Sequence, residues 1–215
     1  VRATGSFAPP GVDRCLPLGA RPWDLHRKDP QRDCSKLVDR LDPVILHIAP
    51  PCEKLSQMRR RPGQTGYSAS AHEAAVQVIE FSVQLVRERV AAGGGGSMEN
   101  PLGSECWTLT VTTEFFGTPE KPLADRYFAA PRFCAYGMKE PGTDRYYRKA
   151  VVLAATYSEI QEVDDRCPGD HIHQPVRGHV KTPSGRWESR GKLSAAYPIL
   201  ACLAGGRAIA CACLR

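Results

Sequence analysis

A cysteine and a carboxylate in this sequence each follow a segment that has the pattern of a β-strand. Cys52 comes directly after Pro50 and Pro51, which end the short apolar run Val44–Ala49. Glu99 lies 47 residues further on, at the end of a second predicted strand. A thiolate is a nucleophile and a carboxyl group donates a proton, so the two side chains are the types that covalent catalysis needs.

Both residues also have an ordinary structural interpretation. A lone cysteine at the end of a strand is commonly a small buried residue. A lone glutamate in a loop is commonly a solvated carboxylate. Neither Cys52 nor Glu99 indicates catalysis alone, and the argument depends on whether the fold brings them together.

Three predicted elements would position this pair. The apolar run Val44–Ala49 is bounded by prolines, which favours a strand buried on both faces, as in a parallel sheet. A spacing of three to four residues between apolar side chains predicts a helix over His72–Ala92, with Ser70 as its cap. A short strand over Ser97–Asn100 follows four glycines, which we expect to weaken it. Since parallel strands end at one edge of a sheet, we expect the cysteine and the glutamate to be neighbours.

The other predicted elements continue this alternation of strands and helices. We expect helices over Asp33–Leu41, Trp107–Phe116 and Ala195–Cys213, and strands over Arg132–Tyr136 and Lys149–Thr156. Strand, helix and strand in this order indicate an α/β layer fold with a parallel core.

Length, charge and cysteine content limit the class of protein. The 215 residues fit one domain, which we expect to begin near residue 23 after an irregular lead-in over 1–22. A net charge of +6 is compatible with a nucleic-acid partner. Nine cysteines without a secretory signal predict a reduced intracellular setting, nuclear or cytoplasmic and not secreted. Pro198 and Arg207 interrupt the apolar stretch 193–214, so we expect a buried or amphipathic helix there and no membrane partner.

A second group of residues has the types that bind metals. Cys167, His171 and His173 lie close together in the sequence, with Cys134 and His179 as further candidates. Cysteine and histidine are the usual ligands of zinc, but a Cys-x3-His-x-His spacing is not a standard zinc motif. Two interpretations stay open, a loop organised by zinc and a polar loop with two exposed histidines.

The order of these motifs resembles that of the DNA cytosine-5 methyltransferases. Pro51-Cys52 is similar to the family's catalytic Pro-Cys motif, and Glu99-Asn100 to its Glu-Asn motif. The stretch from Tyr136-Gly137 to Arg148 is loosely similar to the family's Tyr-Gly and Gln-x-Arg-x-Arg segment. The similarity spans roughly Trp23–Ala210 and points to a divergent branch associated with phages and retroelements.

The resemblance implies a Rossmann-like fold that uses S-adenosylmethionine, with three layers and a mostly parallel sheet. It implies a methyltransferase-like domain over 23–213, in which a loop-rich insertion at 157–194 is a reduced recognition region. The family's Phe-x-Gly-x-Gly turn is not found before residue 52, so the domain is expected to be incomplete at its N-terminus, with its cofactor residues unidentified.

The resemblance also implies roles for individual residues, with DNA as the partner. Cys52 would add to C6 of a flipped cytosine, Glu99 would contact the N3 edge, and Arg148 would be a third catalytic residue. Substrate contacts are implied for Pro51, Asn100, Arg145, Arg59, Arg60 and Arg61. The three consecutive arginines have an alternative interpretation as a solvated basic loop.

Two other functions compete with the enzyme. One is a nucleic-acid-binding remnant of a mobile-element polyprotein without turnover, favoured by the missing glycine turn. The other is a small zinc-stabilised interaction module centred on 134–179. A paired Cys52 and Glu99 would favour the enzyme.

Overall fold

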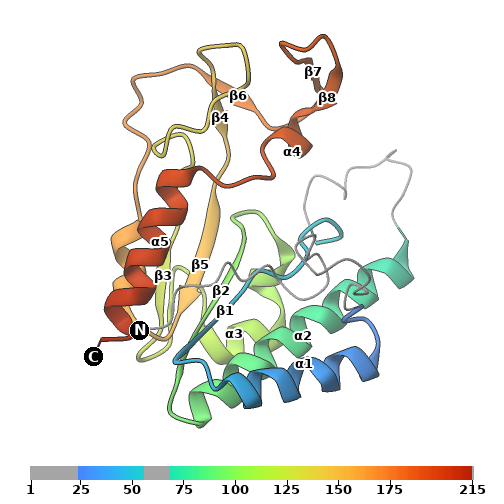
Figure 1. The fold of residues 1–215 in the computed structure, drawn as a ribbon, viewed down its shortest axis with the longest axis vertical. Coiled ribbons are helices and arrows are strands. Elements are labelled where there is room, and N and C mark those ends of the chain that lie inside the picture. Colours follow the sequence, from blue (N-terminus) through green and yellow to red (C-terminus); the bar gives the residue numbers. More distant parts are fainter. Residues whose placement is uncertain (1–23, 56–67, 215) are drawn as a thin grey trace. The chain divides into compact units, whose positions relative to one another are not determined.

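The computed structural model describes residues 24–55 and 68–214 (Figure 1). Over these residues the protein is α/β, as predicted. The chain forms two compact units, one with the residues up to Tyr127 and Leu153–Ser158, the other with Phe128–Val152 and the residues from Glu159. A four-stranded sheet has the order β1-β2-β5-β3, and two further sheets pair β4 with β6 and β7 with β8. The expectations for 1–22 and for Arg59–Arg61 lie outside the described residues.

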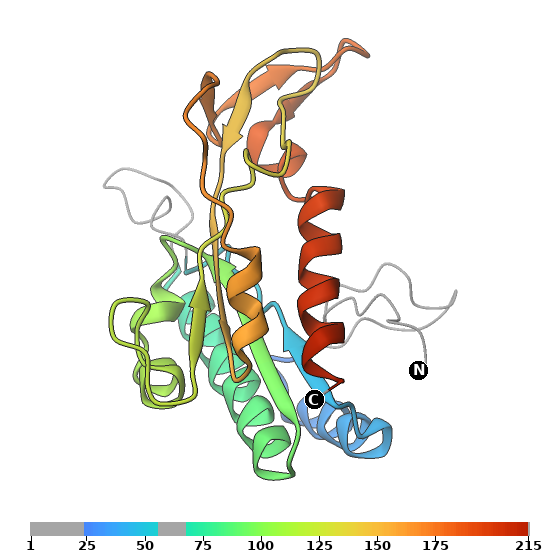
Figure 2. The ribbon, with the colours of Figure 1, turned by 90° about the vertical axis from the view of Figure 1, so that its left-hand side faces the viewer.

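The first unit begins with helix α1 (Lys28–Leu41), which is longer than the predicted helix. Its side chains Cys34 and Val38 pack with Val78 and Leu85 of helix α2 in one apolar cluster. Figures 1 and 2 show α1 and α2 side by side. Burial of this shared apolar surface is what holds the helix pair together.

A strand, a helix and a strand follow in the predicted order. Strand β1 (Ile45–Ile48) leads through α2 (Ala69–Ala91) to strand β2 (Gly95–Pro101), and β1 pairs with β2 in parallel. The cap of α2 is Ser68, whose Oγ accepts the Ala71 N–H at 3.3 Å, and not the predicted Ser70. The two strands therefore end at the same edge of the sheet.

Two of the four glycines form the start of β2, where one of them allows close packing of a helix. Gly95 and Gly96 lie inside β2, and a Cβ on Gly96 would be 2.3 Å from Cγ1 of Val86 in α2. The missing side chain allows α2 to approach the strand closely. Gly96 therefore has a packing role in this strand, and the expected weakening of the strand stays a prediction.

Strand β1 is not buried on both faces. It is the outer strand of its sheet, and Ile45 and Leu46 are half-buried. The apolar sequence predicted a central strand, but β1 has one neighbouring strand, β2, among the residues that the structure describes.

Shorter elements complete the first unit. After β2 come a 3-10 helix, η2 (Glu105–Thr108), and helix α3 (Thr110–Phe116), close to the predicted helix. Strands β3 (Tyr127–Ala129) and β5 (Val151–Ala155) contain the points at which the chain passes between the units. The predicted strand at 149–156 is confirmed in β5.

The second unit has its own small core. Phe133, Met138, Tyr147 and Val151 are buried together, with Val176, Leu193 and Ala201 packed against them. Its further elements are β4 (Tyr146–Arg148), η3 (Ser158–Val163), β6 (His173–Pro175), β7 (His179–Lys181), β8 (Trp187–Ser189), α4 (Arg190–Leu193) and α5 (Ile199–Ala212). Strand β4 pairs with β6 in parallel, and β7 pairs with β8 in antiparallel orientation.

Two expectations for the second unit are wrong. The segment predicted as a strand over Arg132–Tyr136 is a turn, in which Gly137 donates its N–H to Cys134 O at 3.1 Å. The apolar side chains of this turn are buried, and the sequence pattern of a buried turn is the same as that of a buried strand. The helix predicted over Ala195–Cys213 is confirmed in α5, but a fully buried helix is wrong, because Ala208 is its one buried residue and Leu203 is 63% exposed.

The helices of the described residues give no membrane span, since none of them combines enough length with enough apolar character to cross a bilayer.

The contact between Gly96 and Val86 gives the first prediction. We expect Gly96→Ala to lower the free energy of unfolding by about 1–3 kcal/mol, because the added methyl group overlaps Val86. Chemical denaturation followed by circular dichroism measures this loss. Combining it with Val86→Ala should cost less than the sum of the two single changes, since the second change makes room for the first.

The matched control is Gly205→Ala in α5, where a Cβ has no atom within 4 Å. It should leave stability unchanged or raise it, since alanine favours a helix over glycine. Equal losses for the two alanine variants would contradict the close contact.

Candidate functional site

Cys52 lies half-buried in a turn directly after β1. The Leu55 N–H donates to Cys52 O at 3.1 Å, and Leu55 itself is fully buried. The Glu105 N–H donates to Leu55 O at 2.9 Å. The chain that follows β2 therefore anchors the turn that holds the thiol.

Glu99 and Asn100 lie in β2, where both are buried. The Asn100 side chain donates through Nδ2 to the carbonyl oxygen of Pro50 at 3.1 Å. This bond connects the last residues of β2 to the proline loop that follows β1. The structure thus brings Pro51-Cys52 and Glu99-Asn100 to one edge of the sheet, while their catalytic and substrate-binding roles stay predictions.

A second thiol lies at the same place, and the sequence analysis missed it. Burial raises the pKa of Cys106 to about 12; a hydrogen bond with Thr112 opposes this, and the charges of Glu99 and Cys52 add to it. Cys106 is fully buried and stays protonated at neutral pH. Of the two thiols, the half-buried Cys52 is the more accessible one.

A histidine and a carboxylate also meet near this turn. His72 at the start of α2 contacts Glu105 through Nε2 and Oε2 at 2.8 Å. Glu105 is the residue whose backbone holds the Cys52 turn. The two residues are 33 apart in sequence, so no local pattern could have indicated the pair.

The predicted basic residues belong to other parts of the chain. Arg145 and Arg148 lie in the second unit, and both are exposed. Arg145 donates through Nη1 to Gln174 Oε1 at 3.3 Å. The arginine run Arg59–Arg61 lies outside the described residues.

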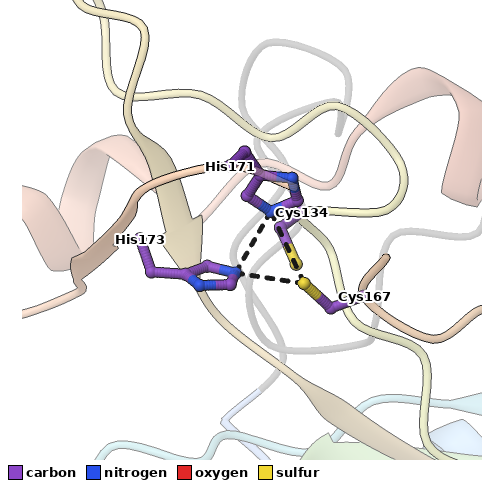
Figure 3. A group of neighbouring side chains, drawn as sticks. All are labelled: Cys134, Cys167, His171 and His173. Atoms are coloured by element: carbon purple, nitrogen blue, oxygen red, sulfur yellow. Dashed lines mark hydrogen bonds between the residues drawn. The ribbon is translucent and has the colours of Figure 1, made fainter. Parts of the chain in front are cut away.

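The second unit brings four metal-binding side chains together (Figure 3). Cys134 comes from the turn before β4, Cys167 and His171 from the loop after η3, and His173 from the first position of β6. Their ligand atoms all lie within 4.8 Å of one another, with Cys134 buried and the other three half-buried. The interpretation as a loop with two exposed histidines is therefore wrong, and His179 lies outside the group in β7.

Three distances in this cluster are close to the edges of a tetrahedron around zinc. Cys167 Sγ lies 3.6 Å from His171 Nε2 and 3.4 Å from His173 Nε2, and the two Nε2 atoms are 3.1 Å apart. Bonds of about 2.3 Å to sulfur and about 2.0 Å to nitrogen at tetrahedral angles give edges of about 3.5 Å and about 3.3 Å. These three side chains could therefore hold zinc with little rearrangement, and the Cys134 sulfur, within 4.8 Å of their ligand atoms, would move closer as the fourth ligand.

The surroundings fix the orientation of these ligands. Asp170 Oδ1 lies 2.8 Å from His171 Nδ1, which leaves Nε2 directed into the cluster. A carboxylate on the outer nitrogen of a histidine is the usual second contact of a metal-bound imidazole. The Gly169 N–H donates to Cys167 Sγ at 3.4 Å, from a glycine with a φ of +79° that other residues rarely adopt. The sequence analysis missed Asp170, although its position next to His171 was a signal.

Burial and neighbouring groups favour the uncharged forms of Cys134 and His173 when no metal is bound. Burial raises the pKa of Cys134, and the neighbouring Cys167 thiol raises it further. Loss of solvation lowers the pKa of His173, with smaller effects from His171 and Arg148. A cation at the centre would favour the thiolate forms of the cysteines and the neutral forms of the histidines.

Comparison with known proteins finds no relative. No family model matches the sequence, and neither the curated proteins nor the solved structures give a significant match. The functional argument therefore depends on the residues and geometry described above.

The bond from Asn100 to Pro50 gives the second prediction. We expect Asn100→Ala to lower the free energy of unfolding by about 1–3 kcal/mol, because the buried Pro50 carbonyl loses its donor. The loosened loop should also make Cys52 react faster with iodoacetamide, as measured by peptide mass spectrometry. The exposed Cys202 is an internal reference whose rate should not change. Equal Cys52 rates in the variant and the natural sequence would contradict a positioning role for Asn100.

Proposed function

We propose that the chain is a DNA cytosine-5 methyltransferase-like enzyme with a Rossmann-like fold, in which Cys52 is the nucleophile. The observation that carries the proposal is the hydrogen bond from Asn100 to Pro50, which holds the Pro-Cys and Glu-Asn segments at one sheet edge. The parallel pairing of β1 with β2 supports it, since ligands of open α/β sheets bind at the carboxyl ends of strands.

The chemistry assigned to the two side chains is nucleophilic addition to the base. The Cys52 thiolate forms a bond to C6 of a cytosine that has left the helical stack, and the electron pair of the C5–C6 double bond becomes available at C5. Glu99 supplies a proton or hydrogen bond at N3, which stabilises the negative charge on the ring. Loss of the C5 proton and expulsion of the thiolate later restore the aromatic ring.

The methyl donor implied by the resemblance is S-adenosylmethionine, which supplies the methyl group to C5 when it is bound. We assign none of the described residues to this cofactor. The proposal for Cys52 and Glu99 is therefore tested with a base that reacts before methyl transfer.

Covalent trapping tests the proposal directly. We expect the protein to form a denaturant-resistant adduct with duplex DNA that carries 2-pyrimidinone at the target position, because this base accepts a thiolate without a methyl donor. The adduct should map to Cys52 by mass spectrometry. Cys52→Ser should abolish it, and Glu99→Gln should slow it by about 10²-fold or more, since general acid catalysis contributes about 10²–10⁴-fold.

Cys202→Ser is the matched control, because it removes an exposed thiol from α5 and should leave the adduct unchanged. A folded protein that binds DNA but gives no adduct on a panel of sequences would contradict the enzyme. That result would instead favour the nucleic-acid-binding remnant without turnover.

We also propose that Cys134, Cys167, His171 and His173 bind one zinc ion. The proposal is favoured by the fit of their distances to a tetrahedron and by the Asp170 contact to His171. Four protein ligands complete the coordination of zinc, so the ion would have a structural role and leave no position for a substrate. It would connect the turn before β4 to the strand β6 that pairs with β4.

Metal analysis tests this site. We expect about one zinc ion per chain in purified protein, as a four-ligand site implies, and expect Cys167→Ala and His173→Ala each to lose it. Mass spectrometry of the metal content gives the ratio, and cobalt substitution should give the absorption bands of a tetrahedral thiolate site. Removal of the metal by a chelator should lower the thermal stability of the second unit.

His179→Ala is the control, since this histidine is six residues beyond His173 and lies outside the cluster. It should retain the metal in full. Loss of metal from this variant, or full retention by the two ligand variants, would contradict the assigned ligand set.

A further inference from the structure

The β7–β8 hairpin has one exposed face that combines cations with an aromatic ring. The register pairs Lys181 with Trp187 and His179 with Ser189, and directly opposite residues point to the same side of a sheet. His179 and Lys181 are exposed, and Trp187 is 70% exposed. Tryptophan is among the residues that are enriched at binding surfaces relative to the rest of the protein surface.

The segment 177–192, which contains the hairpin, has a strong excess of positive charge. Residues 177–192 contain five lysines and arginines and one glutamate, which is four of the chain's six net positive charges. The glutamate, Glu188, pairs across the hairpin with Val180 and so points to the opposite face. There it contacts Lys192 Nζ at 2.9 Å. Among the described residues, no carboxylate lies within ion-pair distance of Lys181 or Arg186.

The turn that joins the two strands is held by its own hydrogen bonds. The Thr182 N–H donates to Arg186 O at 2.8 Å, and the Gly185 N–H donates to Thr182 O at 2.8 Å. Gly185 has a φ of +81°, which this turn requires. Arg186 is therefore presented at a fixed place next to Trp187, and binding would order few additional groups.

An ion pair anchors the hairpin to the rest of its unit. Arg190 Nε donates to the buried Glu140 at 2.5 Å, and the Arg190 N–H donates to Gly178 O at 2.9 Å. Arg190 therefore contacts groups of its own unit. The exposed Lys181 and Arg186 remain available to a partner.

We propose that this face of the hairpin binds duplex DNA, with Lys181 and Arg186 on phosphates and Trp187 packed against a deoxyribose. Phosphate contacts from lysine and arginine position a protein on nucleic acid, and a two-stranded β-ribbon fits the major groove. An acidic protein surface would match the cations, but the DNA backbone also carries a deoxyribose ring beside each phosphate, and the indole can pack against that ring. The choice of DNA as partner rests on the proposed function.

Binding of the full chain to a labelled DNA duplex tests this proposal by fluorescence anisotropy at several salt concentrations. The double variant Lys181→Ala/Arg186→Ala should weaken binding by about tenfold or more and reduce the salt slope by about 2, since each phosphate contact contributes about 0.9. Trp187→Ala should weaken binding by about tenfold with an unchanged salt slope, because burial of the indole against a sugar releases no counterions.

The matched control is Lys36→Ala/Arg40→Ala, which removes the same charge from the exposed face of α1. The proposal is overturned if this control weakens binding as much as the hairpin variant does. It is also overturned if Trp187→Ala has no effect and polyglutamate competes as well as DNA, since the surface would then bind any polyanion.

The binding test of the hairpin and the trapping test of Cys52 can give different results. Hairpin-dependent binding without a 2-pyrimidinone adduct would support this surface and contradict the enzyme. An adduct on Cys52 with hairpin variants that bind normally would support the enzyme and contradict this surface.

Discussion

The close packing of α2 on β2 at Gly96 is the constraint on which the candidate active site depends. A 23-residue helix connects two parallel strands, and it must lie against them to return the chain to the correct edge. Gly96 makes this possible because no side chain separates β2 from Val86. Once β2 has this position, Glu99 and Asn100 follow at its end, and Asn100 bonds to the proline loop before Cys52. The packing of the helix therefore determines where the thiol lies.

The second unit combines a small apolar cluster with polar contacts. The cluster has four buried side chains, and strands β4, β6, β7 and β8 have three residues each. Sheets this short have little stability by themselves. The Cys/His cluster and the ion pair between Glu140 and Arg190 add polar connections between segments that are far apart in the sequence. Small folds commonly use a metal site to supply the stability that a small core does not.

The sequence predicted local elements better than the contacts between them. The apolar periodicity of α2 and the apolar run of β5 were sufficient signals, because each reflects burial of one element. The turn at Phe133–Gly137 was mistaken for a strand, since buried side chains in a turn leave the same pattern. Residue type was enough to name Cys134 as a candidate ligand with Cys167, but their spacing of 33 residues could not show that they meet, which the folded chain does. The spacing of His72 and Glu105 likewise could not show that they meet.

The position of β1 has a consequence for self-association. An outer strand presents backbone N–H and C=O groups along one side, and such an edge can pair with a second chain and start aggregation. Strand β1 is four residues long, and Pro43 and Pro50 flank it. Proline has no N–H to donate, so an added strand could extend its ladder over this short segment and no further. The two prolines on either side of β1 thus limit growth of the sheet into intermolecular fibrils.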